Sequence, residues 1–193
     1  MNRRDAVFLL SAIGVAPLVR GQPSGKRYRI GMLERVSAER NAANLDGLRL
    51  GLRESGYIEG QNLEFVYRSS DGSDERLAGL AEELVRLKVD LILTRGTPAS
   101  LAAKAATGSI PIVIASAADP AGVGLVADLA HPAGNVTGLS AFNTALYSKR
   151  VELLKELIPK LARFAALLDM GNPVQHRAWK EIDAAGRILG IAR

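Results

Sequence analysis

Residues 89–116, VDLILTRGTPASLAAKAATGSIPIVIAS, decide the fold. The run VDLILT is almost wholly apolar, which is typical of a parallel strand covered on both faces of its sheet. Gly96-Thr97-Pro98 predicts a turn into a helix over 99–107, because proline is favoured at the first helical position. The apolar run IPIVIAS then predicts a second strand over 110–116. A strand, a helix and a strand in this order indicate two parallel neighbours joined by a right-handed crossover.

The same alternation extends in both directions from this unit. Apolar periodicity predicts strands over 28–33, 63–68, 135–140 and 163–170, and helices over 44–57, 75–88, 124–130, 146–158 and 174–189. Alternating strands and helices predict an α/β fold with a doubly wound parallel sheet. A chain of 193 residues is long enough for one domain and part of another.

The N-terminus is typical of a targeting segment. Arg3-Arg4 precedes a run of 14 mostly apolar residues, AVFLLSAIGVAPLV, which is the length of a signal-peptide core and too short to span a bilayer. We therefore expect residues 1–21 to be a signal peptide that directs export to the periplasm, and residues 22–27 to be a linker. The route of export (Sec or twin-arginine) and the cleavage position stay open. The alternatives are a buried N-terminal helix and an uncleaved anchor.

Composition excludes several classes of site. Cysteine is absent, so there are no disulfides, thiolate metal sites, cysteine nucleophiles or lipid-modified N-terminal cysteine. The net charge is +5, and loss of Arg3, Arg4, Arg20 and Asp5 with the leader would reduce it to +3. The remaining basic residues are not clustered or interleaved with aromatic residues, as a nucleic-acid surface requires. We expect no nucleic-acid partner.

Catalytic motifs are also lacking. The first strand is followed by GMLERVSAER, which carries no dinucleotide fingerprint, and no phosphate loop, HExxH motif or GxSxG elbow occurs. His131 and His176 are the only histidines, and neither has acidic or histidine neighbours that would make it a metal ligand or a base. We therefore expect no catalytic residue, no metal site and no cofactor.

Ligands of doubly wound sheets bind beyond the carboxyl ends of the strands. The segments expected there are 34–35, 95–97, 115–119 and 172–173. Gly96 allows close approach of backbone, and the first-turn N–H groups near Thr97 carry the positive end of a helix dipole, which suits an anion. Alternatively, Thr97 only caps its helix. Asp119 likewise either starts a helix or offers a carboxylate to an ammonium group.

Four stretches together resemble a known family. The chain is similar to the ABC transporter substrate-binding family related to the tryptophan-binding proteins, in LRESGYIEGQNLEFVYR (52–68), RLAGLAEELVRLKVDLILTRGTPASLAAKAAT (76–107), IPIVIASAADPAGVGLVADLAHPAGNVTGLS (110–140) and KRVELLKELIPKLARFAALLDMGNP (149–173).

The resemblance implies a type I periplasmic-binding fold, in which two α/β lobes close over a small solute. Residues 28–142 would form the first lobe, and residues 143–193 the hinge and the start of the second lobe, so the chain would stop partway through it. The implied function is capture of an amino acid or similar solute and its delivery, chemically unchanged, to an inner-membrane permease. We expect the protein to act as a monomer. The ligand contacts expected at the strand ends are Gly96, Thr97, Ala115, Ser116, Asp119 and Asn172.

Three alternatives stay open. A cytoplasmic enzyme of flavodoxin-like type would need a phosphate loop at 34–44 or a bound cofactor. An effector-sensing module of a transcription regulator would carry a DNA-binding headpiece where this chain has an apolar leader. A shortened copy of a binding protein could also be non-functional.

Overall fold

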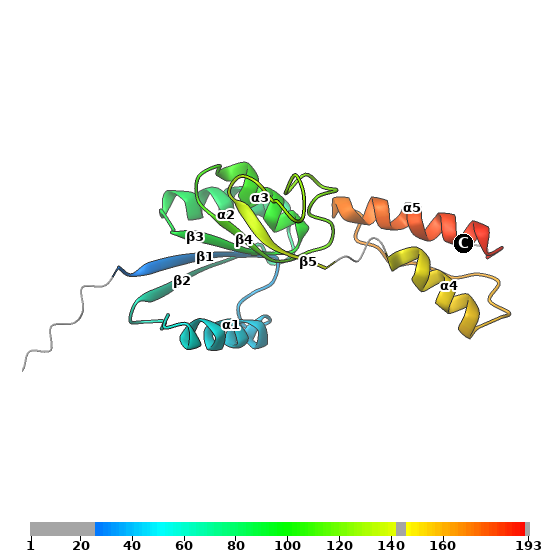
Figure 1. Cartoon of the computed structure of the whole chain (residues 1–193), viewed down its shortest axis with the longest axis horizontal. Helices are drawn as coiled ribbons and strands as arrows, with labels where there is room; N and C mark the ends of the chain where they lie inside the picture. The colour runs from blue at the N-terminus through cyan, green and yellow to red at the C-terminus, as the bar shows by residue number, and fades with distance from the viewer. Residues whose placement is uncertain (1–25, 142–145, 192–193) are drawn as a thin grey trace, which may run out of the picture.

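The computed structural model describes residues 26–141 and 146–191 of the chain. Its centre is a five-stranded sheet in the order β2-β1-β3-β4-β5, and every neighbouring pair is parallel (Figure 1). The strands are β1 (Tyr28–Glu34), β2 (Leu63–Ser69), β3 (Leu91–Arg95), β4 (Ile112–Ala117) and β5 (Val136–Ser140). The predicted α/β parallel sheet is confirmed.

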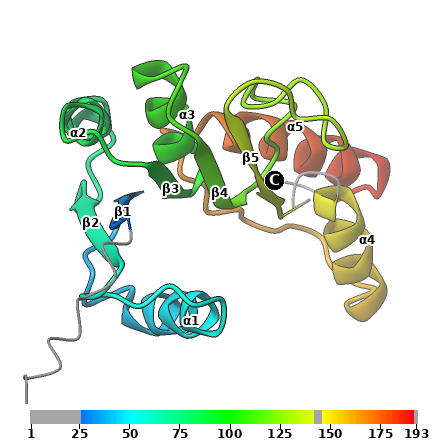
Figure 2. The same ribbon diagram turned by 60° about the vertical axis from the view of Figure 1, so that its left-hand side comes forward.

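Helices cover both faces of this sheet. Figure 2 shows α2 (Glu75–Arg86) and α3 (Thr97–Ala106) on one face and α1 (Ala42–Glu54) on the other. Since β1 leads to β2 on one side and β3 lies on its other side, the strand order reverses around β1. The carboxyl ends of β1 and β3 therefore flank the crevice where doubly wound sheets bind ligands.

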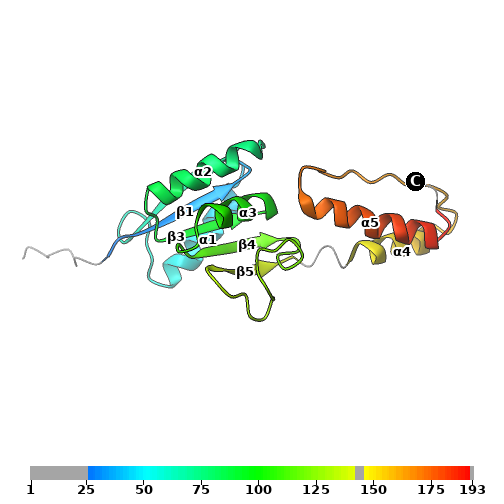
Figure 3. The ribbon, with the colours of Figure 1, turned by 90° about the horizontal axis from the view of Figure 1, so that it is seen from above.

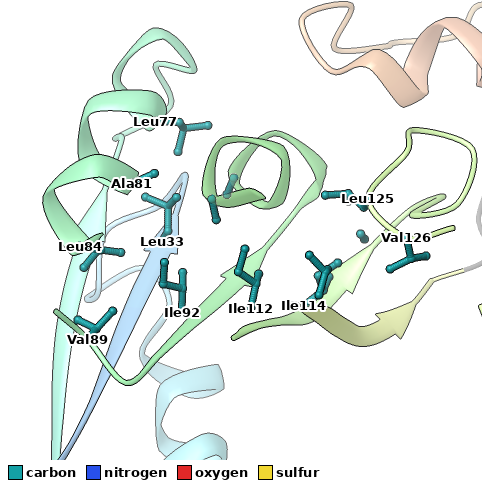
Figure 4. Close-up of a cluster of buried hydrophobic side chains, with 14 residues drawn as sticks. Leu33, Leu77, Ala81, Leu84, Val89, Ile92, Ile112, Ile114, Leu125 and Val126 are labelled. Atoms are coloured by element: carbon teal, nitrogen blue, oxygen red, sulfur yellow. The ribbon is translucent and has the colours of Figure 1, made fainter. Parts of the chain in front are cut away.

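The larger core lies between the sheet and the α2/α3 layer. Leu33 of β1, Ile92 of β3 and Ile112 of β4 are fully buried there, and Leu77 and Leu84 of α2 pack against them (Figure 4). Each such side chain stabilises the fold by roughly 1.5–3 kcal/mol through burial alone. The apolar stripe predicted for 75–88 is thus the face that α2 turns to the sheet.

Two further helices lie beyond the carboxyl ends of the strands (Figure 3). Helices α4 (Tyr147–Leu157) and α5 (Pro173–Ile188) pack on each other around a smaller cluster that contains Val151, Ile182 and Ile191. We refer to residues 146–191 as the α4/α5 unit. Among the described residues no helix is both long and apolar enough to cross a membrane.

Two expected elements are wrong. Residues 124–130 form a turn and bends instead of a helix, because the positive φ of 74° at Gly124 ends the single helical turn before it. Asp128 Oδ1 then accepts hydrogen bonds from Ala130 N at 2.7 Å and His131 N at 3.0 Å, which favours a local turn. The strand expected over 163–170 is not formed: residue 163 makes only an isolated bridge, and residues 164–169 pair with none of the described strands. Leu167 is consequently fully exposed.

The predicted signal peptide, residues 1–21, lies outside the described residues, as do residues 22–25 of the predicted linker.

Candidate ligand-binding site

A hollow of about 280 Å³ lies at the carboxyl edge of the sheet. Its walls come from the end of β1 (34–36), the β3–α3 junction (95–97), the end of β4 (116–118), Ala141 and Asn172. Segments far apart in the sequence meet here because parallel strands deliver their carboxyl ends to one edge. The volume is just under the usual range for small-molecule sites, about 300–1,000 Å³.

The junction between β3 and α3 supplies hydrogen-bond donors. Gly96 has φ 91° and ψ 148°, a conformation essentially restricted to glycine. Its N–H donates to Ser116 O at 2.8 Å, which ties the ends of β3 and β4 together. The first N–H groups of any helix lack intrahelical acceptors, and no side chain in the described part of the structure caps α3, so the amides of Thr97 and Ala99 remain available.

The Thr97 side chain adds a further donor. Thr97 is buried, lines the hollow, and its Oγ1 has no hydrogen-bond partner within the described part of the chain. The sequence leaves open whether this threonine only caps its helix; in the described structure Gly96 is the N-cap residue and Thr97 makes no capping hydrogen bond. A buried hydroxyl without a partner costs about 1–3 kcal/mol, so this group points to a ligand that would satisfy it.

The first turn of α3 is also anchored to its strand. Ser100 Oγ donates to Gly96 O at 2.9 Å and lies 2.8 Å from Thr94 Oγ1. Both Thr94 and Ser100 are fully buried. This small polar network holds the first turn in place independently of a ligand.

A buried carboxylate from the end of β1 also lines the hollow. Glu34 is only 4% exposed, and Asn41 Nδ2 donates to both of its oxygens at 2.8 Å. Asn41 is the N-cap residue of α1 but makes no capping bond, because its amide is turned to Glu34. Burial raises the pKa of Glu34, although the Arg95 guanidinium at 3.8 Å and the Asn41 hydrogen bonds oppose the increase.

Tyr67 of β2 and Arg95 of β3 interact with the Glu34 carboxylate from the two neighbouring strands. Tyr67 donates its hydroxyl to Val36 O at 2.9 Å, and burial and the Glu34 charge raise the pKa of Tyr67 to about 12, so it stays a neutral phenol. Arg95 Nη1 donates to Asn41 Oδ1 at 3.1 Å, and its side chain is 47% exposed. Arg95 therefore retains donors for a ligand, and the hollow presents a cation and an anion side by side.

Glu34→Gln is expected to leave stability at pH 7 unchanged or raise it by up to about 1 kcal/mol, because it removes a charge that burial disfavours, while Asn41 Nδ2 loses one of its two acceptors. The raised pKa of Glu34 means that its carboxylate form disfavours folding above that pKa. The difference between variant and wild type should therefore shrink as the pH falls towards the ordinary glutamate value. Urea unfolding from pH 4.5 to 8 measures it, with exposed Glu181→Gln as the control. A difference that grows on acidification would contradict the assignment.

The structure brings together four of the six expected contacts. Gly96, Thr97, Ser116 and Asn172 line the hollow, and Asn172 also caps α5 by accepting from Val174 N at 3.2 Å. With its oxygen engaged, Asn172 can offer its amide NH₂ group to a ligand.

Ala115 and Asp119 lie outside the lining. Ala115 is exposed on β4, where a register shift brings Ser116 level with Arg95. Asp119 has both oxygens engaged, one by Gly122 N at 3.0 Å and the other by Arg177 at 2.9 Å. Sequence reasoning placed Glu34 and Arg95 at this edge without naming either as a contact, and it missed Asn41 and Tyr67, whose convergence on Glu34 depends on tertiary contacts. The only local signal was the position of Glu34 and Arg95 at strand ends.

The described residues contain no group of three or more histidine, aspartate or glutamate side chains placed to hold a metal ion.

Residues 29–184 match the sequence family described as ABC transporter substrate binding protein. The chain belongs to this family. A tyrosine-binding protein of Clostridioides difficile (strain R20291) is 31% identical over 144 residues, which is 75% of this chain and 41% of that protein. The expected family membership is confirmed.

Solved structures agree with this assignment. A conserved domain protein from Vibrio cholerae superimposes with a TM-score of 0.78 at 31% identity, over 86% of this chain and 55% of the other. An ABC domain from Streptococcus pneumoniae in complex with L-Trp gives 0.75 at 31% identity, over 86% and 56%. A leucine binding protein from Thermotoga maritima, 13% identical with a TM-score of 0.62, shows the fold alone.

The fold is thus that of the type I periplasmic-binding proteins. The chain spans about half the length of these relatives, between 41% and 56% of those compared at 31% identity.

Proposed function

We propose that this chain is the solute-binding component of an ABC importer and that it captures an amino acid in the hollow at the carboxyl edge of its sheet. One observation carries the proposal: the uncapped start of α3, with its unsatisfied Thr97 hydroxyl, faces the same hollow as the buried Glu34 carboxylate. The solute would then be handed to a membrane permease without chemical change.

The opposite charges of the hollow suit a zwitterion. An α-carboxylate would accept hydrogen bonds from the amides of Thr97 and Ala99 and from the Arg95 guanidinium, where the helix dipole also favours negative charge. An α-ammonium would pair with Glu34, which lies 3.8 Å from Arg95. Ser116 and Asn172 would contribute further polar contacts. The names of the relatives, which refer to tyrosine and L-Trp, favour an aromatic side chain.

The remaining features of the proposal concern organisation. Residues 28–142 would act as one lobe and residues 143–193 as the hinge and beginning of another, with residues 1–21 directing export to the periplasm. The protein would work as a monomer, without cofactor, metal or nucleic acid, and by binding instead of catalysis. Closure around a ligand stabilises the state that binds it more tightly, which is how such proteins report occupancy to a permease.

Calorimetric titration with L-tyrosine, L-tryptophan and L-leucine tests the ligand class. Two analogues of tyrosine test its two charged groups separately: 3-(4-hydroxyphenyl)propionate lacks the ammonium group, and tyramine lacks the carboxylate. We expect both analogues to bind more weakly than L-tyrosine. Glu34→Gln should reduce the difference in affinity between L-tyrosine and the propionate, but not the difference between L-tyrosine and tyramine. Absence of binding to every amino acid would reject the proposal.

Thr97→Val should weaken amino-acid binding by about two- to tenfold, because it removes one hydrogen bond to the ligand. The same substitution should raise the stability of the unliganded protein by about 1 kcal/mol, because a buried hydroxyl without a partner is replaced with a methyl group. Calorimetry and urea unfolding measure the two effects. Equal losses of stability and affinity would instead indicate a structural role for Thr97.

A further inference from the structure

Two ion pairs join the sheet to the α4/α5 unit on either side of Asn172. Arg35, just after β1, places Nη1 2.7 Å from Asp169 Oδ2. Asp119, just after β4, places Oδ2 2.9 Å from Arg177 Nη1 on α5. Asp169 and Arg177 flank Asn172, the residue of the α4/α5 unit that lines the hollow. Both pairs therefore act on the segment that carries Asn172.

Arg35 is oriented by the sheet side of the molecule. Its Nε lies 2.8 Å from Asp74 Oδ1, and its Nη2 donates to Gly72 O at 3.4 Å. These contacts leave Nη1 directed at Asp169, whose pKa is lowered by its hydrogen bond to Arg35. The other oxygen of Asp169 accepts from Gly171 N at 3.2 Å and so shapes the turn that leads into Asn172.

The second pair fits tightly against Gly122. A Cβ at this position would collide with Arg177 Nη1 and with the Asp119 carboxylate. Because Gly122 is not in a glycine-only conformation, alanine there would disturb the ion pair without imposing backbone strain and without changing charge. Gly108 provides a matched control, since its Cβ would meet nothing within 4 Å in the described structure and its φ is also ordinary.

We propose that the Arg35–Asp169 and Asp119–Arg177 pairs form a two-point electrostatic clasp that closes the α4/α5 unit on the sheet and holds Asn172 at the hollow. Asp119, Asp169 and Arg177 lie outside the lining of the hollow and act as positioning residues, whereas Arg35 both lines the hollow and pairs with Asp169. Their side chains are between 20% and 55% exposed, so dissolved salt screens them and the clasp is sensitive to ionic strength. Partly exposed pairs of this kind change an equilibrium by about two- to fivefold each.

The absence of cysteine allows a direct test of closure without any ligand. Glu54→Cys on α1 and Lys180→Cys on α5 are exposed positions for two spin labels, and pulsed electron paramagnetic resonance measures the distance between them. At low salt we expect a narrow distance distribution. Asp169→Asn and Gly122→Ala should each increase the open fraction about two- to fivefold, and together more than either alone.

Three comparisons make this result specific. Gly108→Ala and Glu181→Gln should leave the distance distribution unchanged. Arg177→Lys should preserve more of the closed state than Arg177→Gln. In 1 M NaCl the distance distribution of the wild type should broaden towards that of the double variant. A double variant with the wild-type distribution, or salt without effect, would overturn the clasp. Circular dichroism melting verifies that each variant is folded. If Asp169→Asn does not fold, Gly122→Ala still tests the clasp through the other ion pair.

The consequence for affinity rests on the proposed function. If L-tyrosine or L-tryptophan binds, each clasp variant should weaken binding by about two- to fivefold and make it less dependent on salt. Unchanged affinity in a variant that opens would show that closure and binding are independent. A chain that binds no amino acid but still shows the salt-dependent distances would reject the proposed function and leave the clasp intact.

Discussion

Gly138→Ala should lower the free energy of unfolding by about 3 kcal/mol, because overpacking and a disfavoured φ each cost about 1–3 kcal/mol. Gly138 lies in β5 with φ 143°, and a Cβ there would collide with the carbonyl oxygen of Ile114 and lie 2.6 Å from its nitrogen. Since β4 is held between β3 and β5, its backbone has little room to yield. Urea unfolding followed by circular dichroism measures the loss.

Gly79→Ala is the matched control for this prediction. Gly79 lies within α2, and a Cβ there would meet nothing within 4 Å among the described residues. Alanine should therefore raise stability by about 0.5–1 kcal/mol through its higher helix propensity. A Gly138→Ala protein within 0.5 kcal/mol of wild type would mean that β5 does not pair with β4 as described.

Gly96→Ala should weaken amino-acid binding by about ten- to a hundredfold, since a non-glycine residue in this conformation costs about 1–3 kcal/mol and relief of that strain turns the neighbouring amides away from the ligand. The added methyl group would meet nothing within 4 Å in the described structure, so the effect comes from the backbone and not from a clash. Rotation at Gly96 would also lengthen its 2.8 Å hydrogen bond to Ser116 O. Calorimetric titration with L-tyrosine or L-tryptophan measures the change.

Gly60→Ala is the control that distinguishes backbone strain at the hollow from backbone strain elsewhere in the fold. Gly60 also has a positive φ, 84°, with open space around its Cβ, but it precedes β2 at the opposite end of the strands from the hollow. We expect a loss of stability there and wild-type affinity. If both glycine variants lose affinity equally, the Gly96 effect would be a general consequence of destabilisation.

Much of the fold could be predicted from local patterns. The strands over 28–34 and 91–95 are apolar runs, and the stripe on 75–86 has helical spacing, so their burial follows from sequence alone. The approximate location of the hollow follows from the rule that parallel sheets bind ligands at their carboxyl edge. Residues 163–170 show the limit of this reasoning, because an apolar run becomes a strand only when a neighbouring strand is available to pair with it.

The individual residues of the site are harder to predict from the sequence. Ala115 and Ser116 are adjacent small residues, and only the register shift beside β3 decides that Ser116 lines the hollow. The sequence leaves open whether the Asp119 carboxylate binds a ligand or starts a helix, and in the structure it pairs with Arg177, 58 positions further along the chain. Glu34 and Arg95 likewise meet through tertiary structure. Such pairings are set by topology and leave no periodic trace in the sequence.

The hydrogen bond that Ser100 Oγ donates to Gly96 O, and the one that it accepts from Thr94 Oγ1, have a kinetic implication. Donors that are already fixed need no rearrangement before they meet a solute, so encounter should proceed at similar rates for different amino acids. Discrimination among them would then appear in residence time, as is usual among related complexes, and the best solute would be the one released most slowly.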